Sequence, residues 1–147
     1  MDVDAYLSGY ADGESCFCVS FTKSKRHSIG REVRPSFSVS QNGNRMEILE
    51  LFKSHFGCGT IRPDRSDKTF KYEVRSLSDL IEKVIPHFRK YPLLSGKQED
   101  FKLFESICGM MSRGEHLTKE GFNRIVDLAY DMNGSGKRKY SRNEIKI

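Results

Sequence analysis

Tryptophan is absent from the 147-residue sequence, and cysteine and proline occur only four times each. No apolar run approaches the ~18 residues of a membrane-spanning helix, so we expect no membrane partner. The opening segment MDVDAYLSGY is acidic and lacks the basic leader and apolar stretch of a secretory signal. These absences predict an intracellular protein, either in a bacterial cytoplasm or encoded and made inside a chloroplast or mitochondrion.

The four cysteines, at positions 16, 18, 58 and 108, include no CxxC pair. Cys16 and Cys18 would share one face of a strand, and their spacing does not suit a structural zinc site. We therefore expect reduced thiols in a reducing compartment.

Positive charge is in modest excess, with 25 Lys and Arg against 20 Asp and Glu, a net charge of +5 and a pI of about 9.0. A basic balance favours a polyanionic partner, although many basic domains bind nothing acidic. With 37% apolar and 31% charged residues, the chain predicts one globular domain over 1–147.

Two periodicities alternate along the chain. A helix is expected up to about Asp12, and residues 16–22 and 35–41 then alternate as a long hairpin. Residues 44–56 have helical spacing, with Asn44 as cap and Gly57 as stop. Two more strands follow around PDRSDK, and then helices over 77–89, 96–111 and 118–132, the last capped by Thr118. This order predicts an α+β fold of αββαββα type, with a four-stranded antiparallel sheet and helices on one face.

The expected sheet has two unlike faces. One carries Phe, Val, Ile and Tyr, which the helices can cover. Hydroxyls and charged groups fill the other, and such side chains suit base edges in the major groove. A solvated sheet face would have the same composition, so both interpretations stay open. The outward residues are Ser20, Thr22, Ser24, Ser36, Ser38, Ser40, Arg62, Lys71, Glu73 and Arg75.

The stretch YLSGYADGES resembles the LAGLIDADG motif of homing endonucleases, in its variant LAGFVDGEG. Ser8 and Tyr10 are conservative departures, and Ser15 replaces the final glycine. The resemblance extends to the element order, to Gln41 at the end of the second strand, and to the segments FGCGTI, YPLLSGKQEDF and NGSGKRK. The direct matches in the motif are Leu7, Gly9, Asp12, Gly13 and Glu14.

This resemblance implies that the motif helix packs against a second copy, with small residues allowing close approach. Only one motif copy is present, so it implies a C₂ homodimer whose two sheets form a saddle over a palindromic or near-palindromic double-stranded DNA site. Asp12 is expected to be structural, satisfying backbone groups at the helix terminus. The dimer interface would comprise Leu7, Ser8, Gly9, Asp12 and Gly13.

The resemblance also implies divalent-metal hydrolysis of one phosphodiester per strand, with Glu14 and the Gly13 carbonyl as metal ligands. Mg²⁺ is the expected ion; Mn²⁺ could replace it, and Ca²⁺ would bind without supporting cleavage. Gln41 would hold an ordered water, and Arg45 and Lys97 would lie near the scissile phosphate, although the spacing allows a neighbouring lysine to replace Lys97. The histidines at 27, 55, 87 and 116 are scattered, and we expect each at the surface or in the core.

Basic segments outside the sheet add expected DNA contacts. These lie in the link over 23–31, including Lys25 and Arg26, on the adjoining Arg34, and beside the second turn at Asp64. Residues 133–147 form a basic loop and a short helix, for which Ser141 and Glu144 supply a capping box. The loop's three cations, Lys137, Arg138 and Lys139, are expected at backbone phosphates, although a like-charge run is often merely solvated.

Two other functions remain open. A protein of this fold can bind DNA or RNA without cleaving it, as an intron maturase, splicing cofactor or regulator. Retention of Glu14 argues against lost cleavage but does not exclude an added RNA role. The motif could also be accidental in a monomeric α+β protein, which predicts no salt-dependent DNA affinity.

Overall fold

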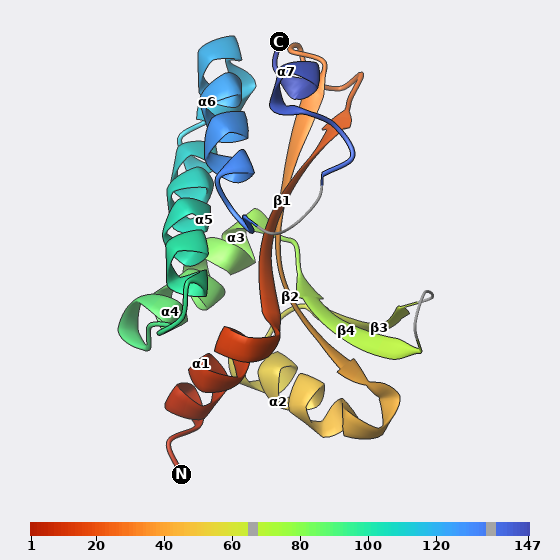
Figure 1. Ribbon diagram of the computed structural model, residues 1–147, viewed down its shortest axis with the longest axis vertical. Helices are drawn as coiled ribbons and strands as arrows, with labels where there is room; N and C mark the ends of the chain where they lie inside the picture. The colour runs from red at the N-terminus through yellow and green to blue at the C-terminus, as the bar shows by residue number, and fades with distance from the viewer. Residues whose placement is uncertain (65–67, 135–137) are drawn as a thin grey trace. The chain divides into compact units, whose positions relative to one another are not determined.

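A computed structural model describes residues 1–64, 68–134 and 138–147 (Figure 1). The chain divides into two compact units. The first comprises Met1–Phe17 and Ser36–Ser95, and the second comprises Cys18–Pro35 and Gly96–Ile147. Each unit is described by itself below, and a single domain over 1–147 stays a prediction. No described helix is long and apolar enough to cross a membrane.

Four strands form one antiparallel sheet in the order β1-β2-β4-β3. The strands are β1 (Ser15–Lys23), β2 (Arg31–Asn42), β3 (Thr60–Asp64) and β4 (Thr69–Val74). β1 and β2 pass from one unit into the other. The α+β class and the four-stranded antiparallel sheet are therefore confirmed, and each observed strand overlaps a segment with alternating polarity.

In the first unit, α1 (Val3–Glu14) begins at Asp2, whose carboxylate accepts from the Ala5 amide. α2 (Met46–Phe56) ends at Gly57, which adopts the left-handed φ of 69° that glycine tolerates best. The aromatic core joins the strands to the helices, because Phe37 of β2 packs against Phe52 of α2 and Phe88 of the helix that follows β4.

Two helix predictions in this unit need correction. Asn44 does not cap α2: it lies within the short η1 helix (Gly43–Arg45), and Arg45 precedes α2 without a side-chain cap. The expected helix over 77–89 consists of α3 (Leu77–Asp79), a π-helical turn η2 (Leu80–Val84) and α4 (Ile85–Lys90). Pro86 has no N–H for the carbonyl four residues earlier, which accounts for the change in helical hydrogen bonding next to it.

The second unit holds the far part of the hairpin with α5 (Lys97–Ser112), η3 (Glu115–Leu117), α6 (Lys119–Tyr130) and α7 (Arg142–Ile145). Phe21 of β1 packs edge-on against Phe122 of α6, with ring centroids 5.6 Å apart. Thr118 caps α6 through the Gly121 amide. Ser141 and Glu144 form the predicted capping box on α7.

Candidate functional site

Glu14 is the last residue of α1, and β1 begins at the next residue. Its side chain is exposed. Ser15 is buried, and its hydroxyl donates to the Ala11 carbonyl at 2.7 Å. The serine that replaces a glycine in the motif therefore ties the last turn of α1 and fixes the point at which Glu14 leaves the helix.

Asp12 has a structural role, but away from its own helix terminus. Its carboxylate accepts hydrogen bonds from the Leu94 amide at 3.0 Å, from the Ser95 amide at 3.1 Å, and from the Ser95 hydroxyl. The expected position of its partners was wrong, because they belong to the segment before α5, 82 residues along the chain. Both oxygens of the Asp12 carboxylate therefore accept hydrogen bonds from Leu94 and Ser95.

The predicted dimer residues divide between the two sides of α1. Gly9 and Gly13 are exposed, and of the atoms described beyond the neighbouring helix backbone, none lies within 4 Å of a Cβ added at either. Leu7 and Ser8, by contrast, are buried within the first unit. Ser8 hydrogen-bonds His87 and Tyr91 there, so these two residues support the interior of the unit and do not form an outer contact surface.

Gln41, Arg45 and Glu14 all belong to the first unit. Gln41 is half-buried near the end of β2, and Arg45 is exposed in η1. Burial, followed by the charge of Glu14, raises the pKa of Tyr10, whereas Arg45 lowers the pKa of the same hydroxyl. The acid and the base therefore both lie within electrostatic range of one tyrosine. Lys97 begins α5 in the second unit.

The polar face of the sheet in the first unit is assembled as the alternation predicts. Lys71 of β4 lies opposite Ser40 of β2 on one side and Arg62 of β3 on the other, and directly opposed residues project to the same face. Ser38 and Glu73 form the next row. The remaining predicted residues of this face are placed at Ser36 and Asp64 on the strands and at Arg75 just after β4.

Two members of this polar face are less accessible than expected. Glu73 is only 8% exposed, and its carboxylate binds Arg62 at 3.3 Å and Arg75 at 3.1 Å. Ser38 is equally buried. Low exposure makes Ser38 and Glu73 less suited to direct base contact, which stays a prediction for both. Glu73 pairs with two arginines whose side chains are 49% and 65% exposed.

In the second unit, Ser20, Thr22, Lys25, Arg26 and Arg34 are exposed. Arg26 and Arg34 both pair with Glu32, at 3.0 and 3.1 Å. Ser24 organises the turn, because its hydroxyl bonds His27 and accepts from the Arg26 amide.

Arg138 makes contacts that were not predicted for the basic loop. Its guanidinium donates to the carbonyls of Val19 and Ala129 at 2.9 and 3.0 Å and lies over the Tyr130 ring at 4.6 Å. Its guanidinium is therefore engaged within the unit, and the phosphate contact expected of it stays a prediction. Lys139 is exposed, and Lys137 lies outside the described residues.

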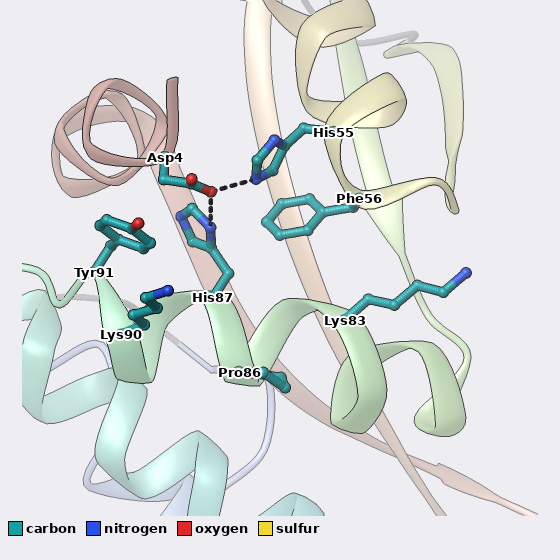
Figure 2. Close-up of a pocket in the computed structure, with 8 residues that line it drawn as sticks. All are labelled: Asp4, His55, Phe56, Lys83, Pro86, His87, Lys90 and Tyr91. Atoms are coloured by element: carbon teal, nitrogen blue, oxygen red, sulfur yellow. Dashed lines mark ion pairs between the residues drawn. The ribbon is translucent and has the colours of Figure 1, made fainter. Parts of the chain in front are cut away.

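Sequence reasoning missed one cluster in the first unit, which Figure 2 shows. Asp4 of α1 is 2.8 Å from His55 of α2 and 3.4 Å from His87 of α4. The three residues border a pocket of about 370 Å³. Burial, followed by the charge of His55, lowers the pKa of His87, while Asp4 raises it. The separations of 51 and 32 residues along the chain give no spacing signal for this cluster.

Comparisons with known proteins agree with this architecture. The family model described as LAGLIDADG endonuclease matches residues 7–108. Homing endonuclease I-ApeII of Aeropyrum pernix is 28% identical over 149 aligned positions, covering 97% of this chain and 87% of that protein. Probable intron-encoded endonuclease 2 of Neurospora crassa is 29% identical over 130 residues, which cover 88% of this chain and 29% of the relative. The chain spans 24–29% of that relative and of two others, from Neurospora crassa and Podospora anserina.

Solved structures show the same fold. The homing endonuclease I-TnaI superposes with a TM-score of 0.86 and 34% identity, covering 97% of this chain and 92% of that chain. I-LtrWI, a LAGLIDADG homing endonuclease bound to target DNA, has a TM-score of 0.90 and 30% identity, and covers 99% of this chain and 50% of its own. I-SmaMI, bound to its uncleaved target with calcium ions, has a TM-score of 0.86, 31% identity, and coverage of 95% and 47%. The chain belongs to the LAGLIDADG endonuclease family.

Proposed function

We propose that this chain is the subunit of a site-specific DNA endonuclease that acts as a homodimer on a long palindromic or near-palindromic site. It hydrolyses one phosphodiester in each strand with a divalent metal. The observation that carries the proposal is the position of Glu14, an exposed carboxylate at the end of α1. The names of several relatives describe them as intron-encoded, which supports an intron-encoded origin here.

The residues fit a hard divalent cation as half of a shared site. Glu14 offers a carboxylate, and Gly13 carries one of the carbonyls that the end of a helix leaves without an intrahelical partner. Mg²⁺ takes few protein ligands and completes its shell with water and phosphate oxygens, so one carboxylate per chain suits it. Such an ion neutralises charge on the phosphate and makes a bound water more acidic. Gln41 would orient a water, and Arg45, with Lys97, would offset negative charge at the phosphate.

The homodimer rests on the open side of α1. Gly9 and Gly13 are four residues apart, so they lie on one helical face, and among the described residues nothing outside the nearby helix backbone lies within 4 Å of a Cβ added there. Glycine in a helix interior costs stability, and the isolated chain gives no packing reason for it. Contact with α1 of a second copy supplies one, and it would bring two Glu14 carboxylates together over the DNA.

The polar sheet face is the proposed DNA surface. Lys71 and Arg62 lie side by side across β3 and β4, and Arg62 also pairs with Glu73. Two like charges on one face favour a polyanion. Arg62 and Arg75, oriented by Glu73, are suited to guanine or phosphate, and Ser36 and Ser40 can donate to or accept from base edges. In the second unit, the exposed Ser20, Thr22, Lys25 and Lys139 extend the proposed contacts.

The test is cleavage selection from randomised DNA duplexes with Mg²⁺, repeated with Glu14→Gln and the control Glu50→Gln. Glu50 is an exposed acid of α2, so its replacement removes the same charge. We expect the unsubstituted chain and Glu50→Gln to select one site with twofold symmetry. Glu14→Gln should bind that site in Ca²⁺ but leave both strands intact in Mg²⁺ or Mn²⁺. Unchanged nicking by Glu14→Gln would contradict the assignment of the metal ligand.

A further inference from the structure

In the Asp4–His55–His87 cluster, a neutral His87 sets two acceptor lone pairs against each other. Ser8 donates its single hydroxyl proton to the Tyr91 carbonyl at 2.6 Å, because a carbonyl can only accept. The Ser8 oxygen must then accept from Nε2 of His87, which lies 3.0 Å away. In the neutral imidazole this fixes the proton on Nε2 and leaves a lone pair on Nδ1. That lone pair faces a carboxylate oxygen of Asp4 at 3.4 Å.

We propose that Asp4, His55 and His87 bind a divalent transition metal ion, with Zn²⁺ as the best match, at a site separate from Glu14. One carboxylate oxygen and one nitrogen from each imidazole all lie within 4.8 Å of one another. A cation among them converts the opposed lone pairs into ligands. Three nitrogen and oxygen ligands with one open position are the set found in zinc sites that retain a water.

One of the ligand separations matches this ion, one is shorter, and all three lie within 4.8 Å. Ligands about 2.1 Å from a tetrahedral zinc are about 3.4 Å from each other, which is the Asp4 Oδ1 to His87 Nδ1 separation. The Asp4 to His55 distance of 2.8 Å needs to open by about 0.6 Å, and both side chains are partly exposed. His87 is held by Ser8 and Tyr91, which is the outer hydrogen bonding that orients metal-binding histidines.

The neighbouring lysines leave room for a cation. Lys83 extends away from the three ligands in Figure 2, and its amine contacts the Gly57 carbonyl and Asp79. Lys90 lies beside the Tyr91 ring, 5.7 Å from its centroid. Asp4 and Glu14 are ten residues apart on α1, or about 15 Å along its axis, so the two sites are distinct. A bound ion would clamp α1 to α2 and α4.

The experiment uses untagged, chelator-treated protein carrying Glu14→Gln, which removes the proposed nuclease metal site. Co²⁺ is the probe, because four-coordinate Co²⁺ absorbs visible light strongly, and Zn²⁺ is then added as competitor. We expect one Co²⁺ per chain, displaced by Zn²⁺, and a rise in melting temperature on metal binding. His55→Asn and Asp4→Asn should each weaken binding at least tenfold, whereas the control His27→Asn, in the second unit, should not.

Circular dichroism and melting in chelator establish that each variant is folded before the comparison. Absence of the visible band in the parent protein would overturn the proposal, as would equal affinity in His55→Asn and His27→Asn. Binding of protons alone, seen as a pH-dependent melt that metal does not alter, would also overturn it. Because Glu14 is already replaced, none of these outcomes bears on the proposed nuclease activity.

Discussion

The substitution Gly9→Ala distinguishes two hypotheses: that α1 faces solvent, and that α1 packs against α1 of a second copy. Within the part of one chain that the structure describes, the new Cβ meets nothing within 4 Å beyond the nearby helix backbone, and Gly9 lies in the interior of a helix. Alanine is favoured over glycine there by about 1 kcal/mol. For a chain of this length, 1 kcal/mol corresponds to a rise of roughly 2–4 °C in melting temperature. An isolated chain should therefore gain stability from the substitution.

In a dimer that packs α1 against α1, the same substitution should weaken the association of the two copies. Each copy then inserts an extra methyl group into a close contact, and overpacking of this kind costs about 1–3 kcal/mol. The dimer dissociation constant should rise roughly 5- to 150-fold. Sedimentation equilibrium over a range of protein concentrations measures that constant, and thermal melting at the lowest concentration measures the stability of the monomer.

Gly109→Ala is the matched control. Gly109 also lies inside a helix, α5, and its added Cβ would meet only the end of the Arg113 side chain at 3.4 Å. It should raise the melting temperature without altering self-association. If Gly9→Ala behaves in the same way, with the dimer constant and DNA cleavage unchanged, the packing of α1 against a second copy is refuted.

Two further predictions concern stability and DNA contact. Arg138→Ala should lower the free energy of unfolding by about 1–3 kcal/mol in denaturant titration, because two backbone carbonyls lose a hydrogen bond from a charged donor. Lys139→Ala should leave stability within about 0.5 kcal/mol and reduce the salt dependence of DNA binding by about one ion. The reverse pattern would place Arg138 at the DNA. Burial lowers the pKa of His87 and of His116, so as the pH falls the unfolded chain takes up protons before the folded chain does. In chelator, the free energy of unfolding should therefore fall as pH drops below about 6.5. A free energy of unfolding from urea titrations that stays constant between pH 8 and 5 would contradict this.

Local signals in the sequence were sufficient for the elements and their faces. Period-2 alternation placed Lys71 and Arg62 on one face of the sheet, and β-strand pairing confirms that they are neighbours. The capping residues Thr118 and Ser141 also act as predicted, because a cap depends only on groups three residues away. The prediction that Asn44 caps α2 was wrong. The short η1 helix precedes α2, so Asn44 does not occupy the capping position.

The sequence did not reveal which polar groups the fold itself uses. Arg138 belongs to a run of cations, yet its partners are backbone carbonyls of β1 and α6. Asp12 is held by Leu94 and Ser95, and Asp4 by His55. Apart from Ala129, these partners are distant in sequence, and each contact depends on how elements pack after they form. Composition and spacing therefore predict the chemistry available to the chain but not which side chains remain free to use it.

These contacts explain why the two faces of α1 carry different residues. Its inner face is held at three positions, by Asp4 to His55, by Ser8 to His87 and Tyr91, and by Asp12 to Ser95. Because these contacts hold α1 in position from one side, the helix can carry glycine on its other side and still keep its position. The same anchoring fixes where Glu14 leaves the helix, so the position of one exposed carboxylate depends on residues up to ten positions earlier in α1. Loss of a tether should consequently displace Glu14 and impair cleavage while leaving the polar sheet face intact.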